Sequence, residues 1–303
     1  MPVHVNRSKK PEGRGSSFGT FGELLQGVGT NDQDFLVTFP ITRFATAYFT
    51  SEPNQSGIKV SPSKKQKSGR LAEKILAYYG LPTGGILELE SNIPIGKGLA
   101  SSSADLVATA RAIDDCFQLG MSEETVKMFL RQIEPTDGVM YPGVVSFYHR
   151  QVQLREFLGQ LPALTVVSID EGGEVDTVEF NKIPKPFTLA EKQEYDRLLQ
   201  QMSQAIRERD SAMIGQIATR SASLNQKLRE KQFFHPVLAI CQEIGALGVV
   251  ITHSGTCVGI LLGQDHPQYH QQVRDAYDSL RLLVDDVSIY HSWYAEQDIT
   301  VYA

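Results

Sequence analysis

A glycine- and serine-rich segment at residues 93–105 carries the strongest chemical signal in the sequence. It reads IPIGKGLASSSAD. Gly96 and Gly98 allow the backbone to turn sharply and to approach a ligand closely. The serines at 101–103 stand where the pattern predicts the first turn of a helix, whose free N–H groups and dipole attract an anion. The segment therefore predicts a loop that binds phosphate.

The plain alternative is a strand-to-helix turn with serine caps. The segment is not a Walker loop, because no Gly-Lys-Ser/Thr closes it, and it lacks the G-x-G-x-x-G spacing of dinucleotide-binding loops. The order of a proline, two glycines, a leucine and a serine run ahead of an apolar helix is more specific than a lone Gly/Ser loop. This order favours the phosphate interpretation.

Two carboxylates lie close together in a second segment, Glu134-Pro-Thr-Asp137. Carboxylate oxygens are hard ligands of the kind that Mg²⁺ binds, and a carboxylate can also accept a proton. The alternative is structural: Glu134 would end a helix ahead of Pro135, and Asp137-Gly138 would be an ordinary turn.

Four further candidates each have a structural alternative. Glu23 could pair with a substrate amine or be a surface strand residue. Residues 254–256, Ser-Gly-Thr, could line a phosphate cleft or form a plain turn between strands. Arg220 offers a fork that suits a carboxylate, although an exposed helix arginine is the simpler interpretation. His253 is more often a packed residue at a strand end than a catalyst.

The elements that must position these residues mix strands and helices without a repeating βα rhythm, which favours the α+β class. Apolar alternation predicts strands and 3–4-residue apolar spacing predicts helices. The expected strands cover 38–51, 57–61, 85–90, 144–148, 152–157, 164–169, 247–252, 257–262 and 284–289. The expected helices cover 71–79, 104–117, 122–133, 189–226, 236–244 and 267–280. Residues 1–15 are polar and basic and are expected to be a frayed tail. The run of Lys64, Lys65 and Lys67 is expected to be a solvated loop, with a lid over phosphates as the minority interpretation.

Composition excludes several classes of protein. The net charge is −6 over 303 residues, and the pI near 5.7 argues against a nucleic-acid partner. Three cysteines without metal-ligand spacing argue against a zinc site or a disulfide framework. No apolar run of about 18 residues predicts a membrane span, and the N-terminus lacks the apolar region of a secretory signal. We therefore expect a cytoplasmic protein. A homodimer is one assembly left open.

Three segments, in order, resemble the motifs of the GHMP kinases, the family of galactokinase, homoserine kinase and mevalonate kinase. The 93–105 loop is similar to the second motif, roughly Pro-x-x-x-Gly-Leu-Gly-Ser-Ser-Ala. Residues 15–27, GSSFGTFGELLQG, resemble the N-terminal motif, and residues 253–262, HSGTCVGILL, resemble the third. The resemblance covers nearly the whole chain. The residues of these motifs and of EPTDGVMYPG at 134–143 are most similar to those of the L-threonine kinases, which feed cobalamin biosynthesis.

The resemblance implies a two-domain α+β fold, an activity and a set of site residues. Residues 1–160 would form a nucleotide-binding domain like ribosomal protein S5 domain 2, and residues 161–303 a ferredoxin-like domain. ATP and Mg²⁺ would be the cofactors, and a small hydroxylated amino acid the substrate. The resemblance places ATP against Pro94, Gly96, Lys97, Gly98, Leu99, Ala100, Ser101, Ser102 and Ser103. It assigns Mg²⁺ to Ser102 and Glu134, catalysis to Asp137, Ser102 and Glu134, and substrate binding to Glu23, Ser254 and Gly255.

The sequence departs from the family pattern at two points, and it leaves the acceptor open. No lysine occurs in residues 15–27, where several family members carry one, and Ala100 stands where the second motif has a glycine. L-Threonine is the first acceptor to test. Homoserine, serine or another small alcohol are alternatives, because such acceptors differ by only about 1–3 kcal/mol of pocket discrimination. A catalytically silent regulator that binds a metabolite is a further alternative.

Overall fold

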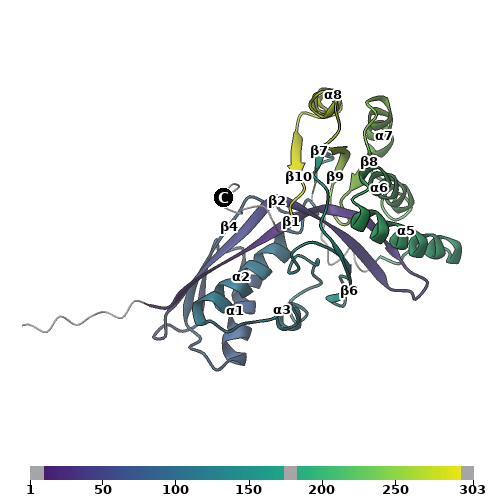
Figure 1. Cartoon of the computed structure of the whole chain (residues 1–303). Helices are drawn as coiled ribbons and strands as arrows, with labels where there is room; N and C mark the ends of the chain where they lie inside the picture. The colour runs from purple at the N-terminus through teal and green to yellow at the C-terminus, as the bar shows by residue number, and fades with distance from the viewer. Residues whose placement is uncertain (1–9, 174–182, 295–303) are drawn as a thin grey trace, which may run out of the picture.

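Two long antiparallel strands, β1 (Glu12–Val28) and β2 (Asp34–Ser51), run through the centre of the molecule. The computed structural model describes residues 10–173 and 183–294, and Figure 1 shows these two strands crossing the molecule. They pair from Glu12 opposite Thr50 to Val28 opposite Asp34, with register shifts in β1 between Phe18 and Leu25. Such bulges bend a strand and redirect its side chains. Here the irregular stretch contains Glu23.

A single sheet extends from this pair in both directions. Within the described residues its order is β10-β7-β9-β8-β1-β2-β4-β3, and β5 pairs with both β2 and β6. The remaining strands are β3 (Ile58–Ser61), β4 (Gly85–Ser91), β5 (Val144–Tyr148), β6 (Gln153–Gly159), β7 (Leu164–Asp170), β8 (Gly248–Ile251), β9 (Cys257–Gly263) and β10 (Val287–His291). The two halves of the sheet meet where β1 pairs with β8, through Glu23 and Ile251.

The helices fall into two groups, one over each half of the sheet (Figure 1). The first group consists of α1 (Gln66–Tyr78), α2 (Ser101–Phe117) and α3 (Glu123–Leu130). Helices α1 and α2 pack on the N-terminal strands, and α3 packs on α1 and α2. The second group consists of α5 (Leu189–Glu208), α6 (Ser211–Asn225), α7 (Phe234–Glu243) and α8 (Tyr269–Arg281). Helices α6, α7 and α8 pack on the C-terminal strands, and α5 packs on α6, β1 and β6. In the described part of the chain, no helix combines the length and apolarity that a membrane crossing requires.

Two groups of buried apolar side chains support this arrangement. The larger includes Phe21, Phe35 and Phe49 and follows β1 and β2 under α2. The smaller, with Val249 and Ile260 at its centre, fills the space between the C-terminal strands and α7 and α8. Burial of apolar surface on this scale is the main favourable term in folding.

Most of the elements expected from the sequence are present, and the mixed α+β content is confirmed. The helical run expected over 189–226 is two helices, because Arg209 adopts a left-handed conformation with φ 57° and the Asp210 side chain caps the start of α6. Helix α1 begins at Gln66, so Lys67 lies in a helix and not in the expected loop. Strands β6 and β7 flank the expected boundary at residue 160, within one continuous sheet. The division into 1–160 and 161–303 stays a prediction.

The expectation of a frayed tail over residues 1–15 was wrong for its last part. Residues 1–9 lie outside the described residues, but β1 begins at Glu12 and packs against α2. A Cβ on Gly13 would lie 2.2 Å from Ala112 O, and one on Gly15 would lie 2.3 Å from Ala108 O. The absence of a side chain at both glycines allows the strand to approach the helix backbone.

We expect Gly15→Ala to destabilise the protein by about 1–3 kcal/mol, because a methyl group there would force β1 away from α2. Chemical denaturation followed by circular dichroism measures the change. Glu12→Thr, at an exposed position of the same strand, is the control and should change stability by less than about 0.5 kcal/mol. Equal stability of the Gly15→Ala variant and the wild type would show that residues 12–15 are not docked on α2.

Candidate active site

A cavity of about 560 Å³ opens where the two halves of the sheet meet. Four segments contribute to its walls: the start of α1, the glycine-serine loop, the 134–137 segment and the turn after β8. Glu23 from β1 and His149 after β5 complete the lining. A cavity of this size, with polar groups converging on one region, is typical of a small-molecule site.

The glycine-serine loop turns into α2 through three residues with positive φ. These are Gly96 at 75°, Gly98 at 77° and Ala100 at 57°. Ala100 is the N-cap of α2 and has no side-chain capping bond. The first-turn N–H groups of α2 therefore face the cavity without a side-chain acceptor from the cap, which suits an anion.

The turn at residues 254–256 holds this loop by close backbone packing. A Cβ on Gly255 would lie only 1.8 Å from Lys97 O, and one on Gly98 would lie 2.7 Å from Gly255 N. No side chain fits at either position. The small residues of the third motif therefore position the glycine-serine loop, whereas the sequence had left open a plain turn between strands.

Lys97 is the one residue of the expected ATP set that does not line the cavity. Its ammonium group forms an ion pair with Asp170 at 2.6 Å and donates a hydrogen bond to Gly173 O at 2.8 Å. Asp170 also accepts a hydrogen bond from Thr256. Lys97 thereby ties the loop to the end of β7.

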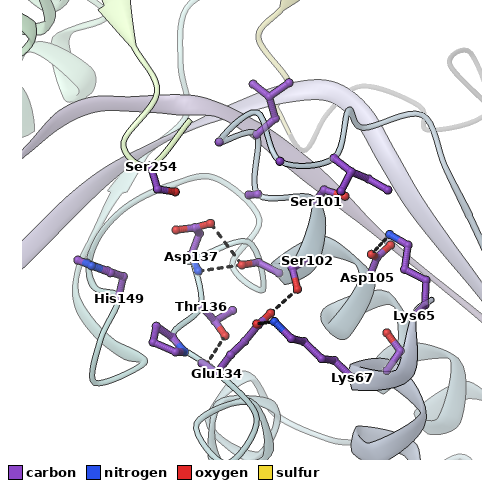
Figure 2. Close-up of a pocket in the computed structure, with 18 of the residues that line it drawn as sticks. Lys65, Lys67, Ser101, Ser102, Asp105, Glu134, Thr136, Asp137, His149 and Ser254 are labelled. Atoms are coloured by element: carbon purple, nitrogen blue, oxygen red, sulfur yellow. Dashed lines mark hydrogen bonds and ion pairs between the residues drawn. The ribbon is translucent and has the colours of Figure 1, made fainter. Parts of the chain in front are cut away.

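The three serines at the start of α2 have different environments. Ser102 donates a hydrogen bond to Glu134 Oε1, and Lys67 forms an ion pair with Oε2 of the same carboxylate. Figure 2 shows Glu134 between Ser102 and Lys67. Ser101 is buried, and its Oγ has no hydrogen-bond partner among the described residues. An incoming polar ligand could satisfy it.

Ser103 positions Asp137 through two hydrogen bonds. The Asp137 N–H donates to Ser103 Oγ at 3.1 Å, and Ser103 Oγ donates to Asp137 Oδ2 at 3.3 Å (Figure 2). Burial raises the pKa of Asp137 to about 6 despite the Ser103 hydrogen bond, and the charge of Glu134 acts in the same direction as burial. Such a carboxylate is mostly ionised at neutral pH but close to its titration range.

Glu23 lines the cavity from the irregular stretch of β1. Its side chain is buried, and Oε2 has no hydrogen-bond partner in the described part of the chain. Burial, followed by the charge of Asp137, holds the pKa of Glu23 well above its usual range. The alternative of a surface strand residue is therefore wrong.

Two histidines form the wall beside Glu23. The rings of His149 and His253 lie 5.1 Å apart, and His253 Nδ1 is 2.6 Å from Gln26 Oε1. Burial, followed by the charge of His149, holds the pKa of His253 well below its usual range. The His253 ring is thus neutral at physiological pH and packed, but it also faces the cavity.

The remaining candidates from the sequence divide into those that line the cavity and one, Arg220, that does not. Helix α3 ends at Leu130, so Glu134 does not end it and instead lines the cavity. The 137–139 turn is present, with Val139 N bonded to Asp137 O at 2.9 Å. Arg220 lies outside the cavity and forms two hydrogen bonds to Glu194, at 2.6 and 3.0 Å.

Sequence reasoning gave the lysine run at the site only a minority interpretation, and it missed His149. Lys65 forms an ion pair with Asp105 and Lys67 pairs with Glu134, so the lysine run faces the cavity rather than solvent alone. The run itself was a signal, but a charge run is usually a solvated face. His149 follows β5 without any local motif, and only the fold brings it to the cavity.

The donor set fits a magnesium ion that is shared with a nucleotide. Ser102 and Glu134 supply two oxygen groups on adjacent segments. Among residues 10–173 and 183–294, no group of three or more His, Cys, Asp or Glu side chains could hold a metal. Magnesium commonly takes one or two protein oxygens and fills its other positions with phosphate oxygens and water.

Comparison with known proteins agrees with this geometry. The family models "GHMP kinases N terminal domain" and "GHMP kinases C terminal" match residues 67–143 and 202–281. L-Threonine kinase of Citrobacter freundii is 27% identical over 80% of this chain and 84% of its own.

Two solved structures share the fold. A homoserine kinase from Cytophaga hutchinsonii superposes with a TM-score of 0.74 at 17% identity, over 96% of this chain and 97% of its own. A second neighbour, solved in complex with AMPPCP and magnesium, has a TM-score of 0.68 at 13% identity over 93% and 98% of the two chains. Since both family models match in order and the two-domain kinase fold is shared almost end to end, the chain belongs to the GHMP kinase family.

Proposed function

We propose that this GHMP kinase transfers the γ-phosphoryl group of ATP to the side-chain hydroxyl of a small amino acid, with L-threonine as the acceptor. One observation carries the proposal. The free N-terminus of α2, the Ser102–Glu134 pair and the half-buried Asp137 face a single cavity. Phosphoryl transfer depends mainly on positioning and charge stabilisation, and these groups are suited to both tasks.

The nucleotide end is the glycine-serine loop. Backbone N–H groups from Gly98 to Ser103 would bind the phosphates, and the buried Ser101 hydroxyl would donate to a phosphate oxygen. Ser102 and Glu134 would hold Mg²⁺. When bound, the ion would neutralise charge that develops on the phosphoryl oxygens.

The acceptor end would contain two carboxyl groups, the buried Glu23 and the half-buried Asp137. Asp137 would accept a hydrogen bond from the substrate hydroxyl and orient it, or take its proton. A loose transition state makes a strong base unnecessary, so a pKa of about 6 is sufficient. Glu23 would bind the substrate ammonium, because that charge pairs with its otherwise unpartnered oxygen.

The L-threonine kinase similarity over most of the chain supports threonine, and the homoserine kinase fold supports homoserine as the second acceptor. A silent regulator has less support, because Ser102, Glu134 and Asp137 lie together in the cavity. The acceptor itself must be decided by assay.

We expect ATP-dependent turnover of L-threonine to exceed that of L-serine, L-homoserine and mevalonate, as measured by mass spectrometry of the products. Ser102→Ala should reduce kcat on the order of 10²-fold, because a metal and phosphate contact is removed. Ser63→Ala, an exposed serine just outside the cavity, should leave turnover unchanged. Preferred turnover of another acceptor would discard threonine, and no turnover of any acceptor would contradict the kinase proposal.

We expect kcat/KM to rise with pH through about 6, because an ionised Asp137 accepts a stronger hydrogen bond from the substrate hydroxyl and can take its proton. Asp137→Asn should lower kcat by about 10²–10⁴-fold. A pH–rate profile between pH 5 and 9 measures the first effect. The absence of an acidic limb near pH 6 would argue against this role.

The same variant should be more stable than the wild type at pH 7.5. The pKa of Asp137 is about 6 in the folded chain against a usual 3.8, so the fold holds the proton more tightly and loses stability as pH rises from about 4 to 6. Asn carries no such charge, and the gain should reach at most about 3 kcal/mol. Thermal unfolding at pH 7.5 checks this, and equal or lower stability would contradict the buried ionised state.

We expect Glu23→Gln to raise KM for L-threonine about 10–150-fold, the value of a lost charge-assisted hydrogen bond. Turnover of 3-hydroxybutyrate, which has the hydroxyl and carboxylate but no amine, should be almost unaffected. Glu12→Gln on the same strand is the control. Equal losses on both acceptors would mean that Glu23 does not recognise the amine.

A further inference from the structure

The cavity gathers its positive charge from one segment. Its cationic lining residues are Lys64, Lys65, Lys67 and Arg70, and all belong to the start of α1 and the turn before it. The N-terminal motif at residues 15–27 contains no lysine. Any lysine or arginine that approaches a transferred phosphoryl group from the described cavity lining therefore comes from this segment.

The start of α1 carries positive charge, which suits an anion but is unfavourable at the N-terminus of a free helix. No acidic residue lies in its first turn, and the N-cap, Lys65, makes no side-chain capping bond. The helix dipole favours negative charge at this end, so lysines at 65 and 67 are unfavourable there unless an anion accompanies them. The carboxylates of Asp105 and Glu134 fulfil that need in the free chain.

These two ion pairs differ in how easily they can be exchanged. The Lys65–Asp105 pair is buried, with side-chain exposures of 14% and 4%. Breaking it would leave a charge in a low-dielectric environment. Lys67 is 47% exposed, while its partner Glu134 is 10% exposed. Lys67 can therefore leave its partner for another anion at small cost, provided that Glu134 gains another cation.

The contacts of Glu134 indicate that a metal ion would be the cation that replaces Lys67. Ser102 donates to one carboxylate oxygen and Lys67 to the other, so both oxygens are engaged in the free chain (Figure 2). A metal held by Ser102 and Glu134 would compete with the Lys67 ammonium for the same carboxylate. Two cations close together repel each other, so binding of the metal-nucleotide complex would release Lys67 toward the adjacent phosphates.

We propose that Lys67 is a catalytic residue that neutralises Glu134 in the free enzyme and moves to a γ-phosphate oxygen when the metal-nucleotide complex binds. The proposal rests on the proposed function, because it takes the cavity to be the nucleotide site. In the bound state the Lys67 ammonium group supplies positive charge to the transferred phosphoryl group. The N-terminal motif cannot supply this charge, because residues 15–27 contain no lysine. The long, flexible lysine stem permits this exchange within one cavity.

Three variants test the proposal. Lys67→Met removes the charge and keeps the stem, and Lys67→Arg keeps the charge. Lys74→Met, on the same helix, is the matched control: Lys74 contacts Gln132 and lies outside the cavity. Calorimetry compares the binding of AMPPCP, which has a γ-phosphate group, with that of ADP, which has none, both with Mg²⁺. Steady-state assays give kcat and the Mg²⁺ concentration for half-maximal activity.

We expect Lys67→Met to weaken AMPPCP binding at least 10-fold, to leave ADP binding within twofold and to lower kcat on the order of 10²-fold. The half-activating Mg²⁺ concentration should fall, because the competing ammonium is gone. Lys67→Arg should retain more activity than Lys67→Met, and Lys74→Met should match the wild type.

Two outcomes would overturn the role of Lys67 while leaving the kinase intact: Lys67→Met behaving like Lys74→Met, or Lys67→Met weakening ADP and AMPPCP equally. Failure of the proposed function is recognised separately in the wild type. If the unmodified protein binds neither nucleotide, the cavity is not a nucleotide site and both proposals fall.

Discussion

The site depends on the close approach of two backbone turns, the glycine loop ahead of α2 and the turn after β8. Gly255 lies so near Lys97 O that no side chain could separate them. Close by, Gly22 has φ 52°, and a Cβ on it would lie 2.5 Å from Ile251 O. These contacts fix the position of the N-terminal half of the sheet relative to the C-terminal half. The phosphate loop, Glu23 and the 253–254 wall consequently face one space, although they are far apart in the sequence.

The charges around the cavity are arranged from one end to the other. Under the proposed function, lysines and the free end of α2 would make the nucleotide end positive, while ionised Glu23 and Asp137 would make the acceptor end negative. Burial raises the pKa of both acceptor-end carboxyls, and the effect of Asp137 on Glu23 shows that they share one environment. This polarity suits a phosphate donor at one end and an acceptor with a hydroxyl and an ammonium group at the other.

Local signals made part of this structure predictable from the sequence. The loop at 93–105 follows from its own glycines and serines, and most strands and helices follow from apolar periodicity. The direction of the Lys97 side chain depends on Asp170, more than 70 positions away, and the position of His149 depends on the whole sheet. Gly13 and Gly15 looked like a disordered tail because the helix against which they pack is distant in sequence. Contacts between residues so distant in sequence produce no periodic pattern from which they could be predicted.

Ala100 gives the phosphate loop a property that a glycine would not. Its left-handed conformation costs an alanine about 1–2 kcal/mol, and the packing of the loop against the 254–256 turn maintains it. An alanine also samples fewer backbone states than a glycine when the loop opens. Under the proposed function, nucleotide binding would therefore lose less conformational entropy in this loop. Part of the cost of ordering the loop would then be met on folding and not on binding.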